Sequence, residues 1–163
     1  MVTLDFGCSN NKVDQAFGVD IDLRNRPDLV FDLSRFPYPL KESSVDRVYA
    51  KHILEHLEDL YGIFKEVYRI LKDGGDFIIE VPHFSSHVAY SEPEHNRYFS
   101  YFIFDKLIAS ISCQVLKRKI TFHRSFRRVG IQFLANRFPD TFERFWTYLF
   151  PAENIQVHLK IEK

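Results

Sequence analysis

The sequence predicts an α/β fold built on a mostly parallel sheet, and three observations support this prediction. Short β-rich runs alternate with polar or helical stretches through the first half of the chain. These runs end at a glycine, a proline or an acid, as strands do before a turn. One segment with apolar residues at helical spacing lies directly before a strand-like run, which is typical of a crossover between parallel strands.

The first half of the chain contains five strand-like runs, at residues 2–6, 17–21, 29–31, 45–49 and 77–81. The clearest helix runs from Leu60 to Leu71, where apolar residues recur at i, i+3, i+4 and i+7. Gly74 or Gly75 is placed to supply its left-handed cap. Only about ten residues separate the first two strands, so we expect a helix of one or two turns at most in that connection.

The second half is richer in aromatic residues, which make up 16% of the whole chain. A polar loop with histidines is expected to follow the fifth strand, at residues 83–96. Beyond it we expect a helix near 100–110, a basic strand near 115–122, helices near 126–137 and 141–150, and a strand at 155–161.

Composition limits the function classes. The chain has 163 residues, enough for one domain, and its net charge is zero, so a nucleic-acid partner is not expected. The two cysteines, Cys8 and Cys113, do not form a disulfide or zinc framework. The N-terminus does not resemble a signal peptide, and no apolar run approaches the roughly 20 residues that span a bilayer. We therefore expect a cytoplasmic protein.

Ligands of an open parallel sheet bind outside the carboxyl ends of its strands, so the residues that follow each run are the candidates for a site. Gly7 follows the first run and permits close approach of a ligand to the backbone. Asp20 ends the second run, where a carboxylate can accept both hydroxyls of a ribose. Asp32 follows the third run and can accept a hydrogen bond from an exocyclic amine.

The same segments occur in order in a known family. Leu4-Asp5-Phe6-Gly7-Cys8-Ser9 is similar to the Leu-Asp-x-Gly-Cys-Gly motif of small class I S-adenosylmethionine-dependent methyltransferases. The resemblance extends in register over residues 2–84. It includes Gly18-Val19-Asp20-Ile21, Asp32-Leu33 with its proline-rich turn, His52 to Leu57, and Glu66 to Gly75.

The resemblance implies a doubly wound, Rossmann-like sheet of seven strands with the last strand antiparallel. It also implies a single domain, 1–163, whose residues 2–84 bind S-adenosylmethionine and whose residues 85–163 form the substrate side. The backbone of Gly7, Cys8 and Ser9 would contact the methionine part of the cofactor, and Ala50 and Lys51 would lie near its methionine end. Asp20, with Ile21 beside it, would bind the ribose. Asp32 and Leu33 would contact the adenine.

The implied activity is methyl transfer to an unidentified acceptor. The acceptor is either a small molecule or a lipid, and it is anionic if the basic segment of the second half binds it. The first loop has one glycine where the family has two or three, with Ser9 and Asn11 at the next two positions. A degenerate domain that binds or regulates without catalysis is therefore the alternative. A nicotinamide dehydrogenase is excluded, because residues 7–12 lack G-x-G-x-x-G.

Histidines are the candidates for a general base, because their ordinary pKa lies near neutral pH. His83 and His95 follow the fifth strand and are the predicted catalytic residues, with structural roles as the alternative. His52, Glu55 and His56 match a zinc-protease pattern, H-x-x-E-H. We expect no metal there, because the family pattern accounts for these residues and no third distant ligand is evident.

Two features of the second half point to partners. Between Lys106 and Pro139 there are eight Lys or Arg and no acid, which is either a solvated face or a site for an anionic acceptor. The strongest candidates within it are Arg127 and Arg128. Phe142, Phe145, Trp146, Leu149 and Phe150 form an apolar stripe at helical spacing, which is either core or the interface of a homodimer.

Overall fold

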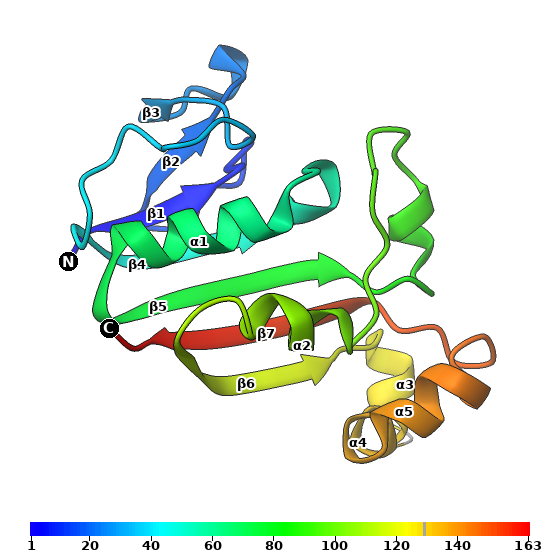
Figure 1. The fold of residues 1–163 in the computed structure, drawn as a ribbon. Coiled ribbons are helices and arrows are strands. Elements are labelled where there is room, and N and C mark those ends of the chain that lie inside the picture. Colours follow the sequence, from blue (N-terminus) through cyan, green and yellow to red (C-terminus); the bar gives the residue numbers. More distant parts are fainter. Residues whose placement is uncertain (129) are drawn as a thin grey trace.

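A seven-stranded sheet forms the centre of the molecule in the computed structural model, which describes residues 1–128 and 130–163 (Figure 1). The strand order is β3-β2-β1-β4-β5-β7-β6. The strands are β1 (Thr3–Phe6), β2 (Phe17–Asp20), β3 (Leu29–Val30), β4 (Val45–Lys51), β5 (Leu71–Pro82), β6 (Cys113–Ile120) and β7 (Asn154–Ile161).

The pairing confirms the predicted topology. Strands β1 to β5 pair in parallel, and β7 is antiparallel to both of its neighbours, β5 and β6. From β1 the chain proceeds outward to β2 and β3, and then returns to the other side of β1 as β4. The carboxyl ends of β1 and β4 therefore lie next to each other at the point where the strand order reverses, which is where ligands of such sheets bind.

The helices are short. The α-helices are α1 (Leu60–Ile70), α2 (Ile103–Ile108), α3 (Arg124–Arg128), α4 (Ile131–Arg137) and α5 (Pro139–Thr141). Single turns of 3₁₀ helix are η1 (Leu23–Asn25), η2 (Leu54–His56) and η3 (His87–Tyr90), and η4 (Phe142–Trp146) is a π-helical turn. The β1–β2 connection, all of it described, contains no helix, as its length predicts. Among the described residues, no helix is both long enough and apolar enough to cross a membrane.

Helix α1 begins where Asp59 accepts a hydrogen bond from the Gly62 backbone, at 2.8 Å. The predicted cap of this helix at Gly74 or Gly75 is wrong. The helix stops at Ile70, and the buried, extended Leu71 leads straight into β5 and pairs with Val45. Gly74, with φ of 69°, lies further along within β5. Pairing to β4 therefore ends the helix before the glycines are reached.

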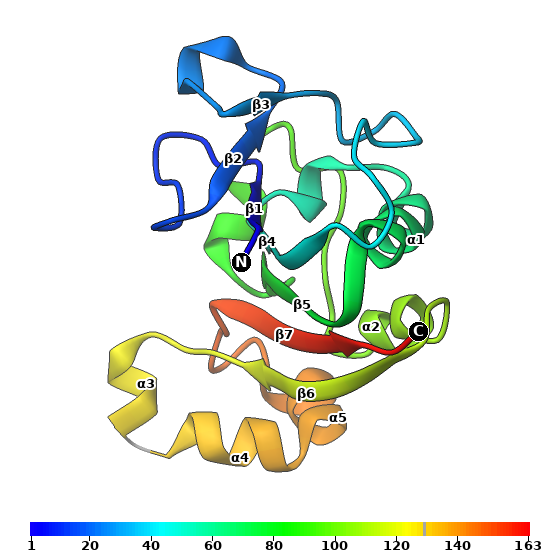
Figure 2. The ribbon, with the colours of Figure 1, turned by 90° about the vertical axis from the view of Figure 1, so that its left-hand side faces the viewer.

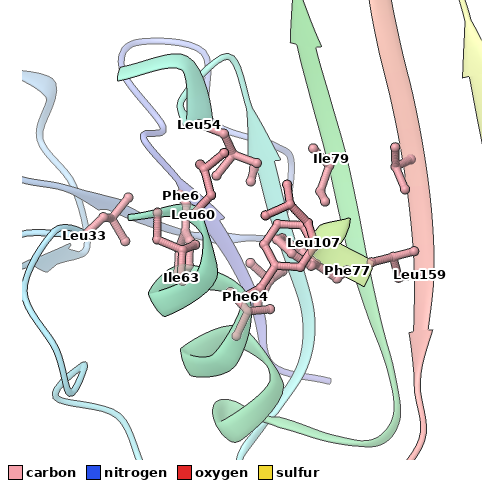
Figure 3. Packing of buried hydrophobic residues seen from close by; sticks show 14 of the residues in the cluster. Phe6, Leu33, Leu54, Leu60, Ile63, Phe64, Phe77, Ile79, Leu107 and Leu159 are labelled. Atoms are coloured by element: carbon pink, nitrogen blue, oxygen red, sulfur yellow. The ribbon is translucent and has the colours of Figure 1, made fainter. Parts of the chain in front are cut away.

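Strand β7, and β5 from Phe77 to Val81, alternate between a buried and a half-buried face. Helices α1 and α2 lie together on one face of the sheet (Figure 2). Figure 3 shows the core beneath them, where Phe64 of α1 packs edge-to-face on Phe77 of β5, with ring centroids 5.3 Å apart. The opposite face carries polar side chains, among them Arg47, Lys51, Asp76, Glu80, Gln156, His158 and Lys160.

The segment between β6 and β7 forms a second, smaller cluster under α3, α4 and α5. The predicted aromatic stripe is divided there. Phe142 is buried and Phe150 is half-buried, whereas Phe145, Trp146 and Leu149 are exposed. The inner residues are core, and the homodimer through the outer ones stays a prediction.

Candidate active site

The first loop keeps the backbone shape that its motif requires. Gly7 has a φ of 64°, and a Cβ atom there would lie 2.6 Å from the Ile53 side chain, so only glycine fits. Ser9 also has a left-handed φ, of 44°, although it is not glycine. Both amides of Gly7 and Cys8 donate to the Val19 carbonyl, at 2.8 and 3.3 Å. The serine that replaces a family glycine therefore retains a left-handed conformation.

Two buried side chains support this loop. The Asp5 carboxylate accepts a hydrogen bond from the Val13 backbone, at 2.8 Å, and burial raises its pKa. Cys8 packs against Gly18, where a Cβ atom would lie 2.6 Å from its sulfur. Burial, followed by the charges of Asp20 and Asp5, raises the pKa of the Cys8 thiol. Cys8 is therefore a neutral packing residue, and only its backbone is available to a ligand.

Asp20 lies at the carboxyl end of β2, beside the first loop. Its carboxylate accepts hydrogen bonds from the Ser9 backbone at 3.2 Å, the Asp22 backbone at 2.9 Å and Asn25 Nδ2 at 2.9 Å. The next side chain, Ile21, is 65% exposed. An oriented carboxylate with an exposed apolar side chain next to it fits the hydroxyls of a ribose and the face of an attached base.

The residues after β3 differ in accessibility. The Asp32 carboxylate is partly exposed, accepts a hydrogen bond from the Ser34 backbone at 2.8 Å and pairs with Arg35 at 3.3 Å. The Leu33 side chain belongs to the core (Figure 3), and its carbonyl accepts a hydrogen bond from Tyr38 at 3.0 Å. A ligand here would meet Asp32 directly but Leu33 only through its backbone.

The residues at the end of β4 differ in whether their side chains are accessible to a ligand. Ala50 is fully buried, so its contribution to a ligand site is also limited to the backbone. The Lys51 ammonium lies 5.0 Å from the ring centroid of Tyr49, on the polar face of the sheet. His52 follows with a φ of 52°, and its amide donates to the Glu80 carbonyl at 2.8 Å.

The two predicted catalytic histidines have different surroundings. His83 is fully buried: Nδ1 lies 3.1 Å from the Ser85 amide, which donates to it, and Nε2 lies 3.1 Å from the Glu143 carboxylate. Both of its nitrogens are thus engaged, Nδ1 within its own loop and Nε2 with η4. His95 is 8% exposed, and its Nδ1 lies 3.0 Å from the Ala89 carbonyl.

His95 also lies against the segment that follows β4, a contact that spans some forty residues of sequence. The Asn96 and Arg97 amides donate to the Glu55 carbonyl, at 2.9 and 3.2 Å, and join the two segments. The His95 ring packs edge-to-face on His56, with centroids 4.7 Å apart. Spacing in the sequence contains no sign of this contact, so sequence analysis did not connect His95 with Glu55 and His56.

Two arginines of the basic segment between Lys106 and Pro139 contact other groups of the protein. Arg127 donates to the Phe122 carbonyl and lies 3.8 Å from the Glu153 carboxylate. Arg118 pairs with Asp105 at 2.6 Å and lies over the Tyr101 ring. The Arg128 side chain lies outside the part of the chain that the structure describes. The site for an anionic acceptor stays a prediction.

Comparison with known proteins agrees with the fold. A sequence model described as "Methyltransferase domain" matches residues 4–79. A SAM-dependent methyltransferase from Archaeoglobus fulgidus has a similar structure, with a TM-score of 0.71 at 17% identity, over 97% of this chain and 85% of that one. Geranyl diphosphate C-methyltransferase from Streptomyces coelicolor, solved with S-adenosyl-L-homocysteine, gives 0.63 at 12% identity, over 98% and 73%.

A cycloartenol-C-24-methyltransferase from Arabidopsis thaliana is 46% identical over 46 residues, which are 28% of this chain and 13% of that enzyme. The chain thus matches only a small part of this curated relative. The likeness in structure shows that the chain has the same fold as these S-adenosylmethionine-dependent methyltransferases. The residues that the methyltransferase-domain model matches, 4–79, contain β1 to β4 and most of β5.

Proposed function

We propose that this protein transfers a methyl group from S-adenosylmethionine to an acceptor with an apolar portion. The observation that carries the proposal is the pair of left-handed residues, Gly7 and Ser9, next to the oriented carboxylate of Asp20. Together with the exposed Ile21, these residues fit the cofactor: a close-approaching backbone, an acceptor for ribose hydroxyls and an apolar surface for adenine. The half from 2 to 84 is the proposed cofactor side, and 85–163 the acceptor side.

Each proposed cofactor contact has a stated basis. The backbone of Gly7, Cys8 and Ser9 faces the methionine part, as do the backbone of Ala50 and the neighbouring Lys51. Asp32 accepts from the adenine amine, next to the Leu33 backbone. The bound cofactor supplies a methyl group on a positively charged sulfur, which is already activated for displacement.

The protein's contribution is alignment. Holding two reactants in line can supply on the order of 7–11 kcal/mol of barrier reduction, so an acceptor that needs no deprotonation requires no base. Where the acceptor must lose a proton, His95 rather than His83 is the candidate general base. The ring nitrogens of His83 are both committed to Ser85 and Glu143.

A cavity of about 420 Å³ in the segment between β6 and β7 supports an acceptor with an apolar portion. That segment leaves β6 and enters β7 at the carboxyl edge of the sheet, the same edge as the cofactor loop. The walls are almost wholly apolar, which favours a hydrocarbon portion of a lipid-like acceptor over a fully ionic one. They include Ile131, Leu134, Phe138, Phe142, Trp146 and Phe150.

Calorimetric titration of the purified protein with S-adenosylmethionine tests the proposal. The parent protein is expected to bind at micromolar concentrations. Asp20→Ala should weaken binding about tenfold to a hundredfold, since losing hydrogen bonds to a charged group costs about 1.5–3 kcal/mol. Asp14→Ala removes an exposed carboxylate from the same β1–β2 connection and should leave affinity unchanged.

Thermal unfolding of both variants, without cofactor, separates a lost contact from a lost fold. Unchanged affinity in a folded Asp20→Ala protein would remove Asp20 from the site. No binding by the parent protein would favour the alternative, a degenerate domain without catalysis.

A further inference from the structure

The glutamate of η2 is buried, and its carboxylate lacks hydrogen bonds within the described part of the chain. Glu55 is 1% exposed, and among the described residues neither of its carboxylate oxygens has a hydrogen-bond partner. His52 Nδ1 lies 3.4 Å from Oε1 without hydrogen-bond geometry, and this carboxylate raises the pKa of His52 against the effect of burial. A buried carboxylate without hydrogen bonds is costly, so such a group calls for a cation or a proton.

Two imidazole rings lie against this carboxylate. One ligand atom from each of Glu55, His56 and His95 lies within 4.8 Å of the other two. Glu55 and His95 are buried, and His56 is half-buried. One carboxylate oxygen and two imidazole nitrogens form a donor set that divalent zinc and its first-row neighbours prefer.

The tautomer of His95 suits it for coordination. Its Nδ1 lies 3.0 Å from the Ala89 carbonyl, which can only accept, so Nδ1 carries the hydrogen. In the neutral ring, Nε2 then has the free lone pair. A histidine whose second nitrogen donates to a backbone carbonyl is the usual arrangement of a metal ligand, since that bond orients the ring. A further carboxylate, that of Glu92, lies 3.7 Å from the same Nε2.

The three side chains come from two segments that backbone hydrogen bonds hold together. The Asn96 and Arg97 amides donate to the Glu55 carbonyl, and Asn96 Nδ2 donates to the His56 carbonyl at 3.2 Å. The ligand positions are therefore set by paired backbone rather than by free loops. Coordination bonds to zinc are about 2.0–2.2 Å long, so the three ligand atoms, now within 4.8 Å of one another, would move closer together around an ion.

We propose that Glu55, His56 and His95 bind one divalent transition-metal ion, preferentially Zn²⁺. The ion joins the segment after β4 to the loop after β5, and it neutralises the buried carboxylate. The set differs from the H-x-x-E-H pattern, because His52 is replaced by His95, the distant ligand that the sequence pattern lacked. The proposal does not depend on cofactor binding, but an ion on His95 Nε2 would prevent His95 from acting as the general base, since its Nδ1 is bonded to the Ala89 carbonyl.

Metal analysis of the full chain is the direct test. Protein purified without added metal or chelator should contain close to one transition-metal ion per chain by elemental analysis. After removal of metal by chelation, titration with ZnCl₂ should show one site with a dissociation constant in the micromolar range or tighter. Binding of Co²⁺ should produce the visible absorption bands of a nitrogen- and oxygen-ligated ion.

Matched variants locate the ion. Glu55→Gln keeps the shape of the side chain and should weaken Zn²⁺ binding about a hundredfold or more, as should His95→Ala. His87→Ala removes an exposed histidine from the same loop and should bind like the parent. Zn²⁺ should raise the melting temperature of the parent and His87→Ala proteins but not that of Glu55→Gln.

Two results would overturn the site. One is a chelated parent protein that binds no Zn²⁺ and whose melting temperature Zn²⁺ does not change. The other is full binding by Glu55→Gln and His95→Ala, which places the ion elsewhere. All these measurements omit S-adenosylmethionine, so failure to bind the cofactor would leave them unaffected.

Discussion

The two faces of the central sheet are built from alternate residues of the same strands, yet they are stabilised by different forces. On the face beneath α1 and α2, β7 contributes Val157 and Leu159, which are buried to 1% exposure or less. On the other face the same strand contributes His158 and Lys160, which pair with Asp76 of β5 at 3.0 and 3.3 Å. Apolar burial holds the first face, and charged hydrogen bonds hold the second.

The difference follows from the short connections between β1 and β4. A helix long enough to cover this face would need more than the roughly ten residues of the β1–β2 connection. Without a covering layer, apolar side chains on that face would stay in water. Polar side chains that pair with one another are the stable solution. The covered face should therefore be sensitive to side-chain volume, and the polar face to pH and salt.

The largest effect is expected from Phe77→Ala on the covered face. Phe77 is fully buried and packs on Phe64, so truncation leaves a cavity that the surrounding helices cannot close. Such changes cost about 3–5 kcal/mol of unfolding free energy. Urea unfolding followed by circular dichroism measures the loss. A loss below about 1 kcal/mol would mean that this face is not the main source of stability.

An intermediate effect is expected from Asp76→Asn on the polar face. The Asp76 carboxylate accepts hydrogen bonds from Arg47, His158 and Lys160. The amide cannot neutralise these groups, so we expect a loss of about 1–3 kcal/mol at neutral pH. The same urea titration applies, and equal stability of variant and parent would contradict the role of the network.

The network also predicts a pH dependence. Burial acts to raise the pKa of Asp76, but the hydrogen bonds from His158, Arg47 and Lys160 outweigh it and lower the pKa below the ordinary value of 3.8. A carboxyl with a lowered pKa in the folded state contributes stability above its unfolded pKa, and that contribution is lost as pH falls through the folded value. The stability difference between parent and Asp76→Asn should therefore shrink below about pH 4. A difference that stays constant with pH would exclude Asp76 as its source.

The smallest effect is expected from Lys160→Met. The Lys160 side chain is 39% exposed, and a partly exposed ion pair contributes at most about 1 kcal/mol. Its contribution should fall further at high salt, because screening shortens the range of the interaction. A double-mutant cycle with Asp76→Asn isolates the pair. A coupling energy that exceeded the Phe77→Ala loss would reverse the order of the two faces.

The sequence by itself determined those features that depend on neighbouring residues. Alternating and helical periodicities located the strands and α1, and the ordered motifs identified Gly7 and Asp20 at the carboxyl ends of β1 and β2. These signals are local, because each depends on residues within a few positions. The end of α1 was wrong for the same reason: pairing of Leu71 with Val45, across the sheet, ended the helix before its glycines.

Only the tertiary structure decided which distant side chains meet. His95 reaches Glu55 and His56 because the loop after β5 folds back and donates its amides to η2. His83 is buried and forms a hydrogen bond with Glu143, sixty residues further along the chain. No periodicity within a segment specifies such contacts, because they depend on the path of the loops and on the sheet that fixes the loop ends.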